Sequence, residues 1–144
     1  MLASKDIVLK IIPQGAPMVM VDTLIAQDGP KTLTGFFIDS DNLFVEDGLL
    51  SEEGLIENMA QSAALRIGWK EMEKNDGSVA FTPAIGVIGS VKDFKLHCHP
   101  GINTSITTEL TVQMEILNAT LITGKIMQGD NILAEGELKI FLQK

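Results

Sequence analysis

One carboxylate and one amide in this 144-residue sequence have the types and spacing that suit proton transfer. Glu57 and Gln61 lie four residues apart, which places both side chains on one face of a helix. Apolar residues such as Ile56 and Met59 flank them, and a carboxyl group partly removed from water has a raised pKa that suits a general acid or base. The pair therefore predicts acid-base chemistry. The alternative from spacing alone is that Glu57 simply reaches water at the edge of the apolar face.

Two histidines and the one cysteine form a second candidate cluster, His97-Cys98-His99. Alternate residues of a strand point to opposite faces, so His97 and His99 share a face while Cys98 points away. The three side chains cannot converge on one ion, and we expect no metal site. Ordinary strand histidines are the simplest interpretation. The alternatives are contacts of His97 and His99 with a bound substrate, or replacement of a catalytic base.

Composition and missing motifs exclude several classes of function. The sequence has no glycine-rich phosphate loop, dinucleotide-binding glycine pattern, Cys-x-x-Cys pair or Gly-x-Ser-x-Gly motif. Its length and its 45% apolar content suit one domain over residues 1–144. Nineteen acidic against 11 basic residues give a net charge of -8, so we expect no nucleic-acid partner. A single cysteine, and no apolar run near the ~20 residues that span a bilayer, predict a cytoplasmic protein with no membrane partner.

The helix that carries Glu57 is expected at residues 51–71. Ser51 is a suitable N-cap, and Glu52 and Glu53 follow where the helix dipole favours negative charge. Apolar residues recur with helical spacing on one face: Leu55, Ile56, Met59, Ala60, Ala63, Ala64 and Ile67. Several of them are small, so a sheet can approach closely. We therefore expect a buried core helix.

Most of the remaining sequence predicts β-strands. Residues 4–12 have the apolar spacing of a short amphipathic helix, which Pro13 ends. Composition and two-residue alternation predict strands at residues 18–25, 31–38, 103–116, 121–127 and 132–142, with an irregular loop at 39–50. In the 103–116 strand, Met114 and Ile116 are expected on the buried face and Glu115 in water. One long helix among five or six antiparallel strands predicts an α+β fold in which the sheet wraps around the helix.

Three segments resemble the bacterial 3-hydroxyacyl-acyl-carrier-protein dehydratases. Residues 57–61, Glu-Asn-Met-Ala-Gln, are similar to the Glu-Ala-Met-Ala-Gln segment of their central helix. Residues 11–22 are similar to their Leu-Leu-Pro-His-Arg-x-Pro-Phe-Leu-Leu-Val-Asp opening. Residues 94–95, Phe-Lys, with 100–101, Pro-Gly, are similar to their Phe-Lys-Arg-Pro-Val-x-Pro-Gly strand. The resemblance implies the hot-dog fold, an antiparallel sheet wrapped around one long central helix, over nearly the whole chain.

The same resemblance implies roles for particular residues. In the resembled enzymes a loop histidine removes the α-proton of a 3-hydroxyacyl thioester, and the helix glutamate of the dimer mate protonates the departing hydroxyl. Glu57 is then the catalytic acid and Gln61 its substrate-binding neighbour. The amides of Gly54 and Leu55 are expected to stabilise the thioester oxygen. The histidine's place, fourteen residues before Glu57, is taken by Leu43, as in a divergent dehydratase-like subgroup associated with aryl polyene and flexirubin-type pigment clusters.

Three functions remain open on these residues. The first is a 3-hydroxyacyl-ACP dehydratase-like enzyme of fatty acid, polyene or polyketide-type biosynthesis. The second is a catalytically deficient subunit that lends Glu57 to an active homologue. The third is an acyl thioesterase in which the helix carboxylate activates water. Each implies a substrate carried on the phosphopantetheine of an acyl carrier protein or coenzyme A, no other cofactor, and a homodimer, tetramer or pair with a homologue.

Overall fold

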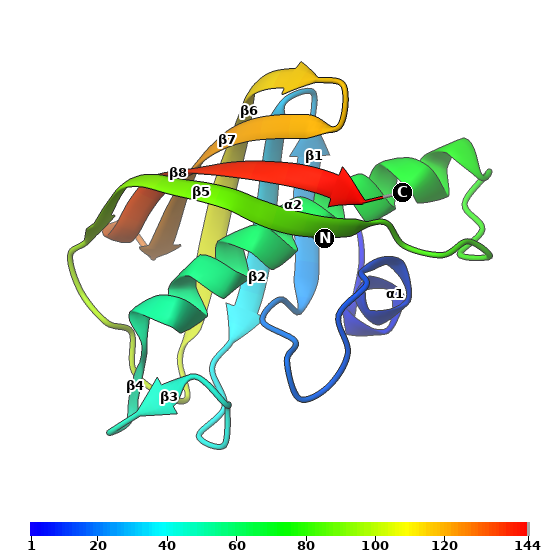
Figure 1. Ribbon diagram of the computed structural model, residues 1–144. Helices are drawn as coiled ribbons and strands as arrows, with labels where there is room; N and C mark the ends of the chain where they lie inside the picture. Colours follow the sequence, from blue (N-terminus) through cyan, green and yellow to red (C-terminus); the bar gives the residue numbers. More distant parts are fainter. Residues whose placement is uncertain (144) are drawn as a thin grey trace.

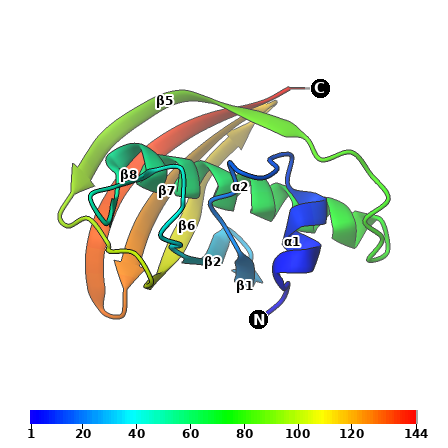
Figure 2. The same cartoon turned by 90° about the horizontal axis from the view of Figure 1, so that it is seen from below.

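The computed structural model describes residues 1–143, and its central feature is a curved sheet that encloses a long helix. Six antiparallel strands follow the order β1-β2-β6-β7-β8-β5, and β3 and β4 form a two-stranded hairpin. Figures 1 and 2 show α2 on the concave side of the larger sheet. The elements are α1 (Lys5–Ile11), β1 (Thr23–Asp28), β2 (Lys31–Phe37), β3 (Val45–Glu46), β4 (Leu49–Leu50), α2 (Glu52–Lys74), β5 (Ile85–Leu96), β6 (Ser105–Ile116), β7 (Ala119–Gln128) and β8 (Asn131–Gln143). The α+β arrangement expected from the sequence is confirmed.

Helix α2 begins at the predicted N-cap, Ser51, and extends beyond the predicted end to Lys74. Its C-terminus is closed by a residue in the left-handed region, since Asp76 has a φ of 55°. Gly77 N donates a hydrogen bond back to Met72 O at 2.9 Å, which completes the common glycine-containing helix ending. Neither α2 nor another helix within residues 1–143 combines the length and the apolar character needed to cross a bilayer.

Helix α1 crosses α2 at a position that admits only glycine. A Cβ atom at Gly68 of α2 would lie 2.0 Å from the backbone oxygen of Ile11, the last residue of α1. Backbone atoms cannot yield as a flexible side chain can, so this close crossing depends on the absence of a side chain. Figure 2 shows α1 lying across the C-terminal half of α2. The short helix predicted at residues 4–12 is therefore confirmed and has a defined packing partner.

The packing of α2 is broader than the single apolar face expected. Leu55, Met59 and Ala63 are buried, while other residues of that predicted face are only partly buried: Ile56, Ala60, Ala64 and Ile67. A polar side of the helix is buried as well. Asn58 Oδ1 accepts a hydrogen bond from Thr108 Oγ1 at 2.5 Å. A polar helix residue can be buried when a strand threonine is its hydrogen-bond partner, as Thr108 is here. The periodicity of apolar residues alone therefore could not reveal this second buried side.

The predicted strand at residues 18–25 is wrong over residues 18–22. β1 begins only at Thr23, and the preceding residues cross α2 as an irregular segment. The backbone of Met20 bonds to helix side chains here: Met20 N donates to Gln61 Oε1 at 2.6 Å, and Asn58 Nδ2 donates to Met20 O at 2.7 Å. Met20 and Val21 are fully buried, so the segment has the apolar composition of a strand without strand pairing.

A β-bulge in β6 reverses the predicted alternation. The pairing of β6 with β7 shifts between Val112 and Met114, so the side chains that follow turn to the opposite face of the sheet. Met114 and Ile116, predicted to be buried, are 53% and 57% exposed. Glu115, predicted to face water, instead reaches Arg66 of α2, with Oε1 3.2 Å from the Nη1 atom. The prediction fails because Gln113 and its neighbours continue a regular polar-apolar pattern through the bulge.

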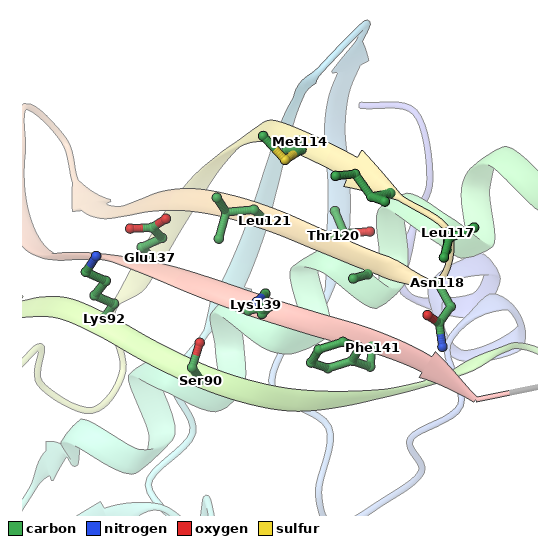
Figure 3. Close-up of a pocket in the computed structure, with 12 residues that line it drawn as sticks. Ser90, Lys92, Met114, Leu117, Asn118, Thr120, Leu121, Glu137, Lys139 and Phe141 are labelled. Carbon is green, nitrogen blue, oxygen red and sulfur yellow. The ribbon is translucent and has the colours of Figure 1, made fainter.

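The reversed side chains contribute to an apolar hollow on the outer face of the sheet. Figure 3 shows Met114 of β6, Leu121 of β7 and Phe141 of β8 among the residues that line it. The hollow has a volume of about 580 Å³. It lies across the sheet from α2, which occupies the concave side. The candidate chemistry of Glu57 must therefore be sought on the other face.

Candidate active site

Glu57 lies in a groove between α2 and β5. The groove has a volume of about 300 Å³ and is lined mainly by apolar residues: Ala60, Ala64, Ile67, Ala84, Gly86, Val87, Ile88 and Ile140, together with Gln14. Among the described residues Glu57 is the one ionisable group of this lining. Its side chain is partly buried, so one carboxyl group faces a space that suits an apolar acyl chain.

Gln61 holds both Glu57 and the segment that crosses α2. Its Nε2 atom donates to Glu57 Oε1 at 2.9 Å and to the backbone oxygen of Met18 at 2.7 Å. Its Oε1 atom accepts from Met20 N at 2.6 Å. Gln61 itself is fully buried. The contact between Glu57 and Gln61 follows from their four-residue spacing, and the three hydrogen bonds fix the carboxyl group on the groove wall.

Gln14 is a second polar residue of the groove, and no motif of the sequence predicts a role for it. Its Oε1 atom is buried and has no hydrogen-bond partner within residues 1–143. An unpaired acceptor beside Glu57 can receive a hydrogen bond from a protonated carboxyl group or from a substrate hydroxyl. The one available signal was its position directly after Pro13, inside the segment that resembles the dehydratase opening.

The segment that crosses α2 ends at a carboxylate with a perturbed pKa. Burial raises the pKa of Asp22 above its usual value of 3.8. The hydrogen bond from Phe37 N to Asp22 Oδ2, 2.6 Å long, opposes this rise, as does Lys5 with its Nζ atom 4.0 Å from Oδ1. Asp22 thus joins the crossing segment to β2 and serves as a structural anchor.

The N-terminal turn of α2 shows how the predicted oxyanion-binding amides are placed. Gly54 N donates to the capping Ser51 Oγ at 3.3 Å, and Leu55 N donates to Ser51 O at 3.1 Å. Gly54 is tightly packed, because a Cβ there would lie 2.8 Å from Phe44 Cβ. Nearby Leu43, which takes the place of the histidine, is 58% exposed. The amides are therefore held within the turn, and their predicted role toward a thioester stays a prediction.

The two histidines lie apart from the Glu57 groove. His97 Nε2 is 3.4 Å from Glu135 Oε2 and is largely exposed. His99 Nδ1 is 2.8 Å from the backbone oxygen of Leu50, and its ring lines a separate hollow beside the N-terminus of α2. Neither histidine lines the groove in the part of the chain that the structure describes. Their suggested contacts with a substrate stay predictions, and the groove of one subunit contains a candidate acid without an imidazole base.

A six-stranded antiparallel sheet wrapped around one long helix defines the hot-dog class of proteins, and solved structures agree. The dehydratase heterocomplex ApeI:P from Xenorhabdus doucetiae is similar with a TM-score of 0.83 and 18% identity over 95% of this chain and 91% of that chain. A sigma28-regulated virulence protein from Campylobacter jejuni has a TM-score of 0.66 and 12% identity, over 95% and 96%. A hypothetical thioesterase with coenzyme A from Streptococcus pneumoniae TIGR4 has a TM-score of 0.62 and 8% identity, over 84% and 87%. At these identities the likeness shows the fold.

The sequence itself matches a family model. The model of the ApeP-like family, described as ApeP dehydratase, matches residues 7–144. This chain therefore belongs to the ApeP-like dehydratase family, and the resemblance read from residues 57–61 and the two other segments is confirmed. The sequence has no significant match among curated proteins.

Proposed function

We propose that this protein supplies the acid half of a dehydratase site for 3-hydroxyacyl thioesters, and that a homologous subunit supplies the base. The histidine of that subunit removes the α-proton, a double bond forms, and the bond from the β-carbon to the hydroxyl oxygen breaks. Glu57 gives its proton to the departing hydroxyl, which leaves as water. The observation that carries the proposal is that Glu57, within residues 1–143, is the one ionisable group that lines an apolar groove, where Gln61 fixes it. The chain is a member of a dehydratase family and has Leu43 in its loop.

The unpaired edge of the sheet supports a partner subunit. β5 pairs with β8 on one side, and among residues 1–143 no strand pairs with its other side. Its Ile85, Val87 and Val91 side chains are 53%, 43% and 40% exposed, which is an apolar edge that a second subunit would cover. The structure from Xenorhabdus doucetiae is itself a dehydratase heterocomplex. A pair with a histidine-bearing homologue joins an acid and a base, whereas a homodimer of this chain lacks the loop histidine in both subunits.

The remaining expected roles belong to the same proposal. The acyl group is carried on the phosphopantetheine of an acyl carrier protein or coenzyme A, in the cytoplasm, for fatty acid or polyene-type biosynthesis. On this proposal the thioester oxygen lies near the N-terminal turn of α2, at Gly54 and Leu55, where the helix dipole favours negative charge. His97 and His99 follow β5 at the end of the molecule that also holds this turn, where they can contact the pantetheine arm.

Turnover by the mixed complex tests the proposal. A 3-hydroxyacyl-ACP is incubated with this chain, with a histidine-bearing homologue, and with both, and the enoyl product is followed by mass. We expect the mixed complex to lose about 10²- to 10⁴-fold of its rate when Glu57→Gln is introduced. The matched control is Glu71→Gln, an exposed carboxylate on the same helix. No enoyl product from the mixed complex would overturn the proposal, and release of free thiol without enoyl product would indicate a thioesterase.

A further inference from the structure

The outer face of the larger sheet, which is the side opposite α2, has an apolar end. This end is the hollow of about 580 Å³ that Met114, Leu121 and Phe141 help to line (Figure 3). Met114 and Ile116 are more than half exposed there, and Phe141 is 38% exposed. A sheet face in contact with water is normally polar, so a continuous apolar end indicates a surface that another molecule covers.

The bulge in β6 produces this apolar end. A regular strand would keep Met114 and Ile116 on the same face as the buried Leu110. The shift of register after Val112 turns both of them outward instead. The same shift brings Glu115 to Arg66 of α2, with 3.2 Å between Oε1 and Nη1. The outward position of the two apolar side chains is therefore a fixed property of the backbone, as bulges in sheets generally are.

The turn between β6 and β7 adds a further apolar side chain to the same end. Leu117 has a φ of 55°, in the left-handed region where glycine and asparagine are favoured. Its side chain lines the hollow and is fully exposed. A leucine at this position has backbone strain and gains no burial within its own chain. Burial of the leucine against another molecule compensates for that strain.

The balance of charge on the outer face points to a second copy of this chain. Five lysines and four carboxylates line the apolar hollow and the polar hollow beside it, which gives this face a charge of +1. The whole sequence carries -8, so the rest of it carries -9. Opposite charges also lie side by side, since Lys92 is the strand partner of Glu137, and Lys125 is the strand partner of Glu135. Two copies therefore repel each other over the rest of their surfaces and not through this face.

The area of the outer face is sufficient for a stable interface. Strands β6, β7, β8 and β5 lie side by side, and the shortest of them, β7, has 10 residues. Four strands at a spacing of about 4.8 Å, with a rise of about 3.3 Å per residue, cover roughly 600 Å² in projection. Side chains raise the accessible area above this value, toward the roughly 800 Å² per partner of a standard interface. Two sheets commonly pack face to face in this way.

We propose that the outer face is an interface between two copies of this chain, packed sheet on sheet about a two-fold axis close to the apolar hollow. Such an axis places the two apolar ends on each other and leaves the paired lysines and glutamates at the rim. Pairing of a subunit along the β5 edge extends the sheet sideways and leaves this face uncovered, so two such pairs form a complex of four chains. A carrier protein suits the face less, because its phosphopantetheine arm must reach Glu57 on the opposite side of the sheet.

Sedimentation of the full-length chain, alone and with a histidine-bearing homologue, tests the inference over a wide range of protein concentration. We expect the smallest complex to double in mass as the concentration rises. Met114→Glu introduces a charge at the apolar end and should weaken this doubling by about 100-fold. Leu117→Asn suits the left-handed turn and removes an apolar side chain, so it should weaken the doubling by about 10-fold without loss of thermal stability. Leu9→Glu is the matched control, because Leu9 is 42% exposed on α1, which packs on α2 away from this face, and the doubling should be unchanged.

Several results would overturn the inference. One is a wild-type complex that never doubles in mass, and another is a doubling that survives in both Met114→Glu and Leu117→Asn. If Met114→Glu does not fold, Leu117→Asn alone decides. Loss of the doubling in Leu9→Glu would place the interface elsewhere, and a carrier protein that binds the wild type but not Met114→Glu would show a different occupant. Enoyl formation by the smallest active complex should not change in Met114→Glu, so this inference and the proposed function fail separately.

Discussion

Replacement of Gln61 by methionine should destabilise the protein by an amount that can be worked out from its three hydrogen bonds. Methionine has nearly the same shape but neither donates nor accepts at the buried position. Met20 N loses its acceptor in a fully buried place, which costs about 1–3 kcal/mol. Met18 O and Glu57 Oε1 can regain water, so each lost bond there costs about 0.5–1.5 kcal/mol at most. Buried thioether surface offsets part of the loss, and we expect about 2–4 kcal/mol in total.

Urea unfolding at fixed protomer concentration measures this loss. With a slope of about 2 kcal/mol/M, in the middle of the range for small proteins, the midpoint should fall by roughly 1–2 M. Glu57→Gln is the matched control, because the new amide oxygen still accepts from Gln61 Nε2 and the free energy of unfolding should change by less than about 1 kcal/mol. A loss below about 1 kcal/mol for Gln61→Met would refute the reasoning, since the crossing segment would then be held by packing alone.

Three further changes test other contacts. Gly68→Ala should lower the free energy of unfolding, measured by thermal melts, by about 1–3 kcal/mol or more, because its Cβ meets Ile11 O. Gly15→Ala should have little effect in the same measurement, because no atom beyond its chain neighbours lies within 4 Å of the new Cβ. Asn58→Leu should cost about 2–4 kcal/mol in urea unfolding, since Met20 O and Thr108 Oγ1 lose their partner; a smaller change than Gly15→Ala would contradict this. Because the pKa of Asp22 is raised in the folded state, stability falls as the pH rises from about 3.8 through that raised pKa. Asp22→Asn should flatten this part of the curve of urea midpoint against pH, and an unchanged slope would contradict the reasoning.

Local signals in the sequence were sufficient for the start of the central helix and for one contact of the site. Ser51 and the two glutamates after it locate the start of α2 because capping is a local interaction. The four-residue spacing of Glu57 and Gln61 likewise predicts their contact, which is 2.9 Å long in the structure. Within a helix, sequence distance and spatial distance are directly related, and such features can be predicted without knowledge of the rest of the fold.

Features that depend on distant pairing were not predictable. The main partner of Gln61 lies 41 residues earlier in the chain, in a segment whose composition resembles a strand. The bulge in β6 arises from its register with β7, while the polar-apolar pattern of β6 continues without interruption. Arg66 pairs with Glu115 because this bulge turns Glu115 toward it. Sequence periodicity assumes regular elements, so it assigns Met114, Glu115 and Ile116 to the wrong faces.

The contrast between the two halves of the site supports a division of labour between subunits. Glu57 is held by a buried residue with three hydrogen bonds, a level of constraint that suits a group whose proton must meet one particular hydroxyl. Leu43, where the base would be, is exposed and can take part in no proton transfer. On the proposed function, pairing with a histidine-bearing homologue completes the groove that contains Glu57 and leaves the site beside Leu43 without a base. Such a pair has one complete site of two, so its rate per pair should be set by the groove of this chain, in which Glu57 is the acid.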